Sequence, residues 1–345
     1  MKLLVERELD SLLVTNLLNV RYLTGYTGTN GACIVTPEER LFFTDFRYRE
    51  QAREQVPDFE RIEAGPNMLD DVAKRLGGRA GFDDEHLSVA AHRRVAEKAP
   101  EGVELVPAGG VVERLRAVKD EREVAAMTRA AELSTAGYES LRERGLAGRT
   151  EREVAVGLVR LMEDLGAEGP SFPPIVAAGA RGALPHGVPG DLEIPPDTLV
   201  VIDLGTVVDG YCSDCTRTLA TGPLPDETLE LYELVRRAQG EALPAARAGA
   251  ECSAVDKVAR DIIDAAGHEE HFGHGLGHGV GLEIHERPRL GKTAKGSLEA
   301  GNAVTVEPGV YLPGNVGVRI EDLVIVTDGE PRVLTGFPKE LVTVG

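Results

Sequence analysis

Five residues in the C-terminal half of the chain have side chains that bind hard metal ions. They are four carboxylates and one imidazole: Asp203 in VVIDLG, Asp214 in YCSDCT, His278 in GHGLGHGVG, Glu307 in TVEPGVY and Glu321 in VRIEDL. A ligand set dominated by oxygen favours Mn²⁺ or Co²⁺ over a metal that prefers sulfur. Four carboxylates carry a charge of −4, which two divalent cations would balance. If the five side chains converge, they predict a two-metal hydrolase.

A single acidic residue is most often a surface charge or a strand-end cap, so the surroundings of these carboxylates matter. The stretches VVIDLG and TVEPG flank them with apolar side chains that cannot solvate charge. Two carboxylates on one face of an apolar strand pair repel each other. Buried charges require compensation, and a bound metal ion provides it.

The first pair of carboxylates is brought together by a predicted hairpin. Asp209-Gly210 is a strong two-residue turn signal. A hairpin centred there pairs Asp203 with Thr216. Asp214 then lies on the same face as Asp203, as its diagonal neighbour.

The second pair follows from a second predicted hairpin. The turn residues Pro313-Gly314-Asn315 centre it on Gly314, which places Glu307 directly opposite Glu321. A unit of two helices and a hairpin therefore occurs twice, over 120–220 and 226–327. This repetition predicts a pseudo-symmetric fold with the site between its halves.

Hydrophobic patterns predict two domains, at residues 1–115 and 116–345. The first alternates strands and helices, as an α/β domain does, with strands expected at 11–16, 31–36 and 40–45 and helices at 68–76 and 88–97. The second domain is predicted to have helices at 120–144, 151–165, 226–247 and 253–266, with strands at 198–208, 211–220, 303–311 and 318–327. Thr150 and Glu153 form a capping-box pattern at the start of the second of these helices.

Composition excludes several classes of function. A net charge of −19 over 345 residues opposes binding to a phosphate backbone, so no nucleic-acid partner is expected. The start of the chain, MKLLVERELD, does not resemble a signal peptide, and no stretch is apolar enough to span a membrane. A cytoplasmic location is therefore expected. Four cysteines are too few for a disulfide framework, and the Cys212-x-x-Cys215 pair is interpreted as small buried strand residues.

His278 lies in the glycine-rich stretch FGHGLGHGVGLEIHE, which also contains His274 and His285. No register of this stretch fits a dinucleotide-binding loop, and it lacks the ending of a phosphate-binding loop. Pro288 rules out a zincin helix starting at His285. Three histidines occur within twelve positions, and the glycines between them allow the backbone to approach a ligand closely. This combination favours a functional site.

The series VIDLG, YCSDCTRT, HGLGHGVGLEIHERP, TVEPGVY and GVRIED resembles the metal-dependent, proline-specific peptidases with the pita-bread fold. These are aminopeptidase P and prolidase, with methionine aminopeptidase as a more distant relative. The N-terminal stretches NVRYLTGYTGTNGACIVT and FFTDFRYREQA resemble the N-terminal domain of the proline-specific members. The resemblance implies an α/β N-terminal domain followed by an α+β pita-bread catalytic domain with pseudo-twofold symmetry.

The resemblance also implies roles for individual residues. Asp203 and Asp214 would hold one metal ion, Asp214 and Glu321 would bridge both ions, and His278 and Glu307 would complete the other. Glu307 would also accept the proton of the attacking water. The resemblance adds four residues around the substrate: His186 and His285 as substrate-contacting histidines, Arg319 as a cation that orients the carboxylates, and Tyr311 as a wall of the site.

The function expected from the resemblance is that of an Xaa-Pro aminopeptidase with two divalent ions, Mn²⁺ first and Co²⁺ or Zn²⁺ as alternatives. Its substrates would be proline-containing peptides or dipeptides, and family members are commonly homodimers. The nearest alternative is an Xaa-Pro dipeptidase, which needs a closed site beyond the proline and a cation for the dipeptide's carboxylate. Methionine aminopeptidase fits the N-terminal domain poorly, and creatinase lacks the ligand set. A non-catalytic peptide-binding module is a further alternative, and such modules lose ligands.

Overall fold

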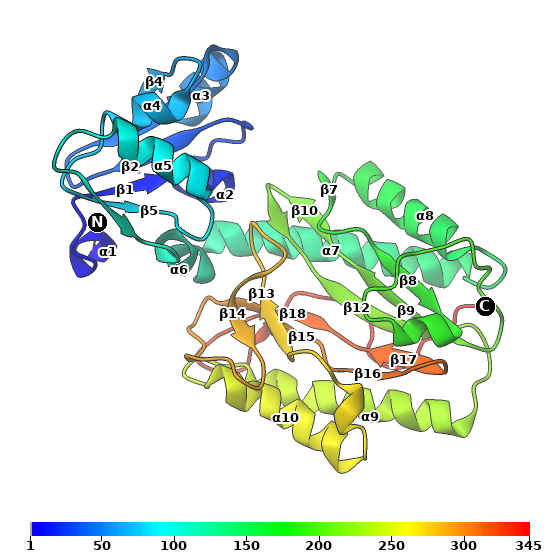
Figure 1. The fold of residues 1–345 in the computed structure, drawn as a ribbon. Coiled ribbons are helices and arrows are strands. Elements are labelled where there is room, and N and C mark those ends of the chain that lie inside the picture. The colour runs from blue at the N-terminus through cyan, green and yellow to red at the C-terminus, as the bar shows by residue number, and fades with distance from the viewer. Residues whose placement is uncertain (1) are drawn as a thin grey trace. The chain divides into compact units, whose positions relative to one another are not determined.

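A computed structural model describes residues 2–345, and the chain divides into two compact units, Met1–Arg116 and Ala117–Gly345. Figure 1 shows the elements of each unit. No helix within the described residues is both long and apolar enough to cross a membrane.

The first unit is a mixed six-stranded sheet with the strand order β4-β3-β2-β1-β5-β6. Its strands are β1 (Ser11–Val14), β2 (Ala32–Val35), β3 (Arg40–Thr44), β4 (Glu60–Glu63), β5 (Arg79–Phe82) and β6 (Glu104–Pro107). Its helices are α1 (Lys2–Glu6), α2 (Leu17–Thr24), α3 (Arg49–Gln55), α4 (Met68–Ala73), α5 (Val89–Lys98) and α6 (Val111–Ala117). The three predicted strands and both predicted helices are present, although α4 ends three residues early. Apolar clusters on both faces of the sheet form its core.

The second unit contains four long helices, α7 (Glu121–Arg144), α8 (Glu151–Asp164), α9 (Asp226–Ala242) and α10 (Cys252–Ala265). Thr150 caps α8 and forms the expected capping box with Glu153. Within this unit α7 and α8 lie on one side of the strands, and α9 and α10 lie on the other (Figure 1). Each helix pair buries its apolar face against its own set of strands, so two separate cores sandwich the strands between them.

The strands of the second unit form two hairpins and the segments around them. The first hairpin consists of β9 (Leu199–Leu204), β10 (Thr206–Val208), β11 (Tyr211–Cys212) and β12 (Cys215–Ala220). The second consists of β15 (Ala303–Val306), β16 (Gly309–Leu312), β17 (Val316–Arg319) and β18 (Asp322–Ile325). The remaining strands are β7 (Gly169–Pro170), β8 (Ile175–Ala178), β13 (Gly277–Gly279), β14 (Glu286–Leu290) and β19 (Arg332–Val333).

The predicted register of both hairpins is confirmed. In the first, Val208 pairs with Tyr211 and Asp203 pairs with Thr216. In the second, the ladders Leu312–Val316 and Val306–Asp322 share one register, which sets Glu307 against Glu321 between them.

Each hairpin differs from its prediction in one respect, because a break divides each of its long strands in two. The breaks fall at Gly205 and at Ser213-Asp214 in the first hairpin, and at 307–308 and 320–321 in the second. At Gly205 the backbone of the facing strand is so close that a Cβ atom would lie 2.0 Å from the Ser213 carbonyl oxygen. The breaks coincide with Asp214, Glu307 and Glu321, so these carboxylates lie where the ladder opens.

Candidate active site

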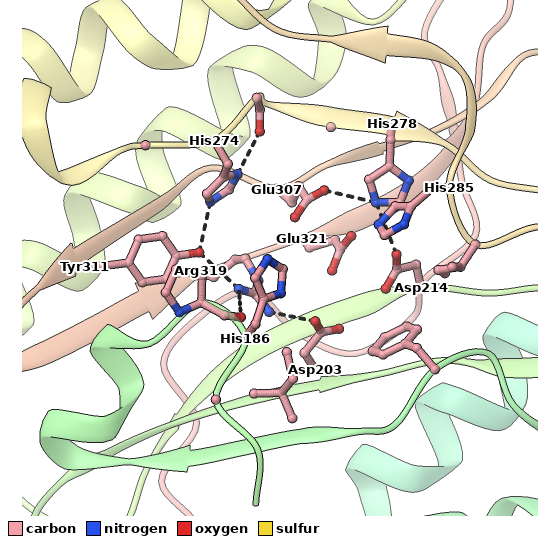
Figure 2. A pocket seen from close by; sticks show the side chains of 18 of the residues that line it. His186, Asp203, Asp214, His274, His278, His285, Glu307, Tyr311, Arg319 and Glu321 are labelled. Atoms are coloured by element: carbon pink, nitrogen blue, oxygen red, sulfur yellow. Dashed lines mark hydrogen bonds and ion pairs between the residues drawn. The ribbon is translucent and has the colours of Figure 1, made fainter.

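The two hairpins meet at their breaks and bring the predicted metal ligands into one pocket. Asp203 comes from β9, while Asp214 lies in the break before β12. Glu307 and Glu321 lie in the break of the second hairpin, and His278 projects from β13. Figure 2 shows the carboxylates pointing toward a common centre, with His278 beside Asp214 and Glu307.

Distances between the side chains identify a core of ligands. One ligand atom from each of Asp214, His278 and Glu321 lies within 4.8 Å of the other two. The His278 Nε2 atom is 3.5 Å from Asp214 Oδ2 and 3.3 Å from Glu307 Oε1. Asp203 lines the same pocket. The structure thus brings all five predicted ligands together.

The local backbone fixes how His278 presents its ring. Its Nδ1 atom lies 3.0 Å from the Gly279 carbonyl oxygen, which can only accept a hydrogen bond. Nδ1 therefore carries a proton, and Nε2 points toward the carboxylate cluster, where its lone pair is available to a cation. The neighbouring strand β15 is so close that a Cβ atom on Gly277 would lie 2.0 Å from the Thr305 carbonyl oxygen. The glycine before His278 is required for this approach.

The electrostatics of the cluster fit divalent cations. Desolvation raises the pKa of Asp203, Asp214 and Glu321, and for Asp214 the neighbouring charges of Glu321 and Asp203 raise it further. Burial would also raise the pKa of Glu307, but hydrogen bonding and positive charge from His278, when its ring is protonated, lower it to about 2. Asp203, Asp214 and Glu321 therefore hold their protons tightly unless a cation is present to balance their charge.

Two buried carboxylate oxygens, Asp203 Oδ1 and Glu321 Oε1, have no hydrogen-bond partner among the described residues. An ionised oxygen in such a place carries a large desolvation cost. Metal coordination would satisfy both atoms, so the residues present fit the predicted ions.

Arg319 holds several of the site's residues through one guanidinium group. Its Nη2 donates to Asp203 Oδ2 at 2.6 Å, and its Nε donates to Thr216 Oγ1 at 2.9 Å. The Thr216 hydroxyl in turn donates to Glu321 Oε2 at 2.7 Å. Arg319 therefore contacts one carboxylate directly and another through Thr216.

The Nη1 atom of Arg319 contacts Tyr311, and Tyr311 in turn contacts His274. Arg319 Nη1 lies 3.0 Å from the Tyr311 hydroxyl, which lies 3.0 Å from His274 Nε2. The Nδ1 of His274 faces the Gly275 carbonyl oxygen at 2.8 Å, so Nε2 accepts from Tyr311. Tyr311 forms part of the pocket wall as predicted. The sequence placed His274 in a histidine cluster without giving it a role.

The pocket encloses about 1040 Å³ and contains both predicted substrate histidines, His186 and His285. The His285 ring meets the His278 ring edge-on, with 4.4 Å between their centroids. Desolvation and the nearby His278 lower the pKa of His285, so its imidazole is neutral at neutral pH. His186 follows Pro185, whose carbonyl oxygen accepts from Arg319 Nη1 at 3.1 Å, and Figure 2 shows the His186 ring in the pocket.

Two groups of pocket residues escaped the sequence analysis. One is the apolar stretch 172–175, with the sequence FPPI, which forms part of the wall. The other is Arg289, which pairs with His278 across β13 and β14. The signal for Arg289 was its position in HERPRL after His285, but its pairing depends on an irregular register between these strands.

Comparisons with known proteins agree with this geometry. Residues 125–328 match the model of metallopeptidase family M24, and residues 1–118 match the creatinase/prolidase N-terminal domain. The chain belongs to metallopeptidase family M24. The catalytic unit therefore has the pita-bread fold, and the predicted family and fold class are confirmed.

Similar proteins include both kinds of proline-specific exopeptidase. The chain is 35% identical to an Xaa-Pro dipeptidase of Pyrococcus horikoshii over 98% of this chain and 95% of that protein. It resembles the structure of an Xaa-Pro dipeptidase from Bacillus anthracis with a TM-score of 0.96 and 39% identity, covering 99% of this chain and 97% of that one. An X-Pro aminopeptidase from Thermotoga maritima gives a TM-score of 0.90 at 34% identity, covering 97% of each chain. The chain is thus a prolidase-like peptidase, and dipeptidases are prominent among its relatives.

Proposed function

We propose that this protein is an Xaa-Pro dipeptidase that uses two divalent metal ions, with Mn²⁺ as the first candidate. The observation that carries this proposal is the buried cluster of carboxylates and His278, in which two carboxylate oxygens have no hydrogen-bond partner within residues 2–345. Similar proteins named as Xaa-Pro dipeptidases favour the dipeptidase, which the sequence analysis held as its alternative, over the aminopeptidase. Homodimer formation and a cytoplasmic location stay predictions.

The proposed roles follow from the positions of the side chains. Bound ions would supply a Lewis acid and an activated water at neutral pH. Glu307, beside His278, would accept the proton of the attacking water and return it to the proline nitrogen. His285 and His186 face the pocket and stabilise the substrate's carbonyl oxygen as its negative charge develops. Arg319 holds Asp203 in position through a hydrogen bond of 2.6 Å.

Arg289 has the properties needed to capture the free carboxylate of a dipeptide. It lines the pocket, and its side chain makes no hydrogen bond or ion pair with any residue in 2–345. It lies close enough to His285 to lower the pKa of that histidine. An arginine with no protein partner can form two parallel hydrogen bonds with a carboxylate. In a longer peptide the proline is followed by another peptide bond, so it has no free carboxylate for Arg289 to bind.

Replacing Arg289 by methionine is expected to raise KM for an Xaa-Pro dipeptide about 10- to 100-fold, because a charge-assisted hydrogen bond contributes about 1.5–3 kcal/mol. The value of kcat should change little, since the contact is equally present before and during the reaction. Steady-state kinetics with Ala-Pro measures both. Lys292→Met is the matched control, because Lys292 is exposed and does not line the pocket. An unchanged KM in Arg289→Met would show that Arg289 does not bind the carboxylate of the dipeptide.

A direct assay tests the proposed function. The purified protein with Mn²⁺ should hydrolyse Ala-Pro and release alanine, and it should leave a tetrapeptide such as Ala-Pro-Gly-Gly largely intact. Efficient cleavage of the tetrapeptide would favour the aminopeptidase, the activity named for the similar structure from Thermotoga maritima. Cleavage of neither substrate, together with no binding of Mn²⁺, would favour a peptide-binding module.

A further inference from the structure

The segment that carries His186 lies between β8 and β9 and lines the pocket. It comprises residues 179–190 and is called the His186 loop here; it begins with a short 3-10 helix, Gly179–Ala183. After that helix it has no strand pairing, and His186 and Val188 are exposed. A catalytic side chain on such a segment requires anchors elsewhere, because misplacement by about 1 Å can reduce a rate a hundredfold.

Glu151 anchors both ends of the His186 loop through one carboxylate. Its Oε1 accepts from the backbone N–H of Ala178, just before the loop, at 3.0 Å. Its Oε2 accepts from the backbone N–H of Gly190, the last residue of the loop, also at 3.0 Å. The Glu151 side chain is 0% exposed. A fully buried carboxylate thus ties the two ends of the loop together at the start of α8.

Arg181 extends this anchor into the loop itself. Its Nε lies 3.1 Å from Glu151 Oε1 and 3.0 Å from Oε2, so it balances the buried charge. Its Nη2 donates to the Val188 carbonyl oxygen at 2.6 Å, two residues beyond His186. The carboxylate therefore fixes the arginine, and the arginine fixes the part of the loop that follows the histidine.

The side of the loop that faces the metal ligands is held by the second hairpin. Arg319 Nη1 donates to the Pro185 carbonyl oxygen at 3.1 Å, immediately before His186. The backbones of Gly182 and Gly317 touch so closely that a Cβ atom on Gly317 would lie 1.9 Å from the Gly182 oxygen. Pro185 and Val188, on either side of His186, are thus each held by an arginine.

We infer that Glu151 and Arg181 are positioning residues that set the place of His186 in the pocket without touching the substrate. The inference rests on the proposed function for the role of His186. It predicts that the buried carboxylate affects substrate turnover and leaves the metal ligands undisturbed, because none of its contacts reaches a proposed ligand.

The variant Glu151→Gln tests this inference with little change in volume. A glutamine offers one acceptor oxygen, and its NH₂ group would face a backbone N–H or the arginine Nε, which are also donors. At least one end of the loop therefore loses its anchor. We expect kcat/KM for Ala-Pro to fall about 10- to 100-fold. Mn²⁺ affinity, measured by calorimetric titration, should stay at the wild-type value.

The matched control is Arg152→Met. The Arg152 side chain also joins α8 to the end of the loop, because it pairs at 2.7 Å with Asp191, the residue after Gly190, but this pair is exposed. The Arg152→Met substitution should leave kcat/KM and Mn²⁺ affinity unchanged, since an exposed ion pair contributes little. Arg181→Met serves as a second variant if Glu151→Gln does not fold. Arg181 is 36% exposed on its side chain, so its replacement disturbs the core less.

The double variant Glu151→Gln/His186→Ala separates positioning from a general loss of stability. If Glu151 acts through His186, the double variant should be no slower than His186→Ala alone. Hydrogen exchange supplies a readout that needs no activity: in Glu151→Gln the amides of Ala178 and Gly190 should lose protection, while β9 and β12 keep theirs.

Three results would overturn the inference. The first is a kcat/KM for both Glu151→Gln and Arg181→Met that equals the value for Arg152→Met. The second is a double variant whose loss of kcat/KM equals the product of the losses caused by Glu151→Gln and His186→Ala alone. The third is a loss of Mn²⁺ affinity in Glu151→Gln that accompanies its loss of kcat/KM. A wild-type protein that binds Mn²⁺ but does not cleave Ala-Pro would instead contradict the proposed function. In that case the hydrogen-exchange result still decides whether Glu151 anchors the loop.

Discussion

Replacing Asp214 or Glu307 by alanine should abolish peptidase activity. Each carboxylate lies within 3.5 Å of His278 Nε2 in the structure, and each is a proposed ligand. Metal catalysis stabilises the transition state by several kcal/mol, so the loss of a ligand is expected to slow turnover by about a thousandfold or more. Glu307→Ala also removes the proposed proton acceptor.

Turnover of Ala-Pro at saturating Mn²⁺ and circular dichroism together measure this effect. The N-terminal unit should stay folded in both variants. Asp261→Ala is a suitable control, because Asp261 is an exposed carboxylate paired with Lys257 on the surface of α10. Activity within tenfold of wild type in either ligand variant would contradict the proposed metal centre.

Addition of Mn²⁺ to chelator-treated protein is expected to raise the melting temperature of the catalytic unit. A ligand at a hundred times its Kd stabilises the folded state by about 2.7 kcal/mol. In a domain of this size that corresponds to a shift of about 5–10 °C. Differential scanning calorimetry measures the shift, and Asp214→Ala should greatly reduce it.

The size of that shift should grow as the pH rises from 5 to 8. Burial raises the pKa of Asp214 and Glu321, so the metal-free folded state holds protons on them more tightly than the unfolded chain does. The metal-free fold therefore loses stability as pH rises from the unfolded pKa of about 4 toward the raised values. Bound Mn²⁺ takes the place of those protons, so the metal-bound fold does not lose this stability as the pH rises. In acid the protons compete with Mn²⁺ for the carboxylates and weaken its binding. A shift that is flat or larger at pH 5, or activity that stays constant down to pH 5, would contradict this account.

The sequence predicted the ligand pairs because two turns determine the register of two hairpins. Asp209 and Gly210 have the positive φ angles, 51° and 79°, that such a turn requires, and Gly314 has φ 75°. Once the turns are located, pairing follows by counting along the strands. Local chemistry was therefore sufficient to pair Asp203 with Thr216 and to set Glu307 opposite Glu321.

Other features depend on contacts between distant parts of the chain, which local patterns do not determine. The strand breaks arise where the two hairpins join, for example through the Glu321 N–H donating to the Thr216 carbonyl oxygen at 3.1 Å. Arg289 enters the pocket through an irregular strand pairing. Glu151 looks in sequence like an ordinary acidic residue in the first turn of a helix, and its contacts with the His186 loop appear only in three dimensions.

The breaks in the two hairpins have a consequence for synthesis of the chain. Each half of the catalytic unit supplies two of the carboxylates, and the last of them, Glu321, lies 118 residues after Asp203 in the sequence. A nascent chain that ends before the second hairpin lacks Glu307 and Glu321, so it has no complete ligand set to offer an ion. The proposed metal centre can therefore be complete only in chains whose two halves have both been made and have closed on each other.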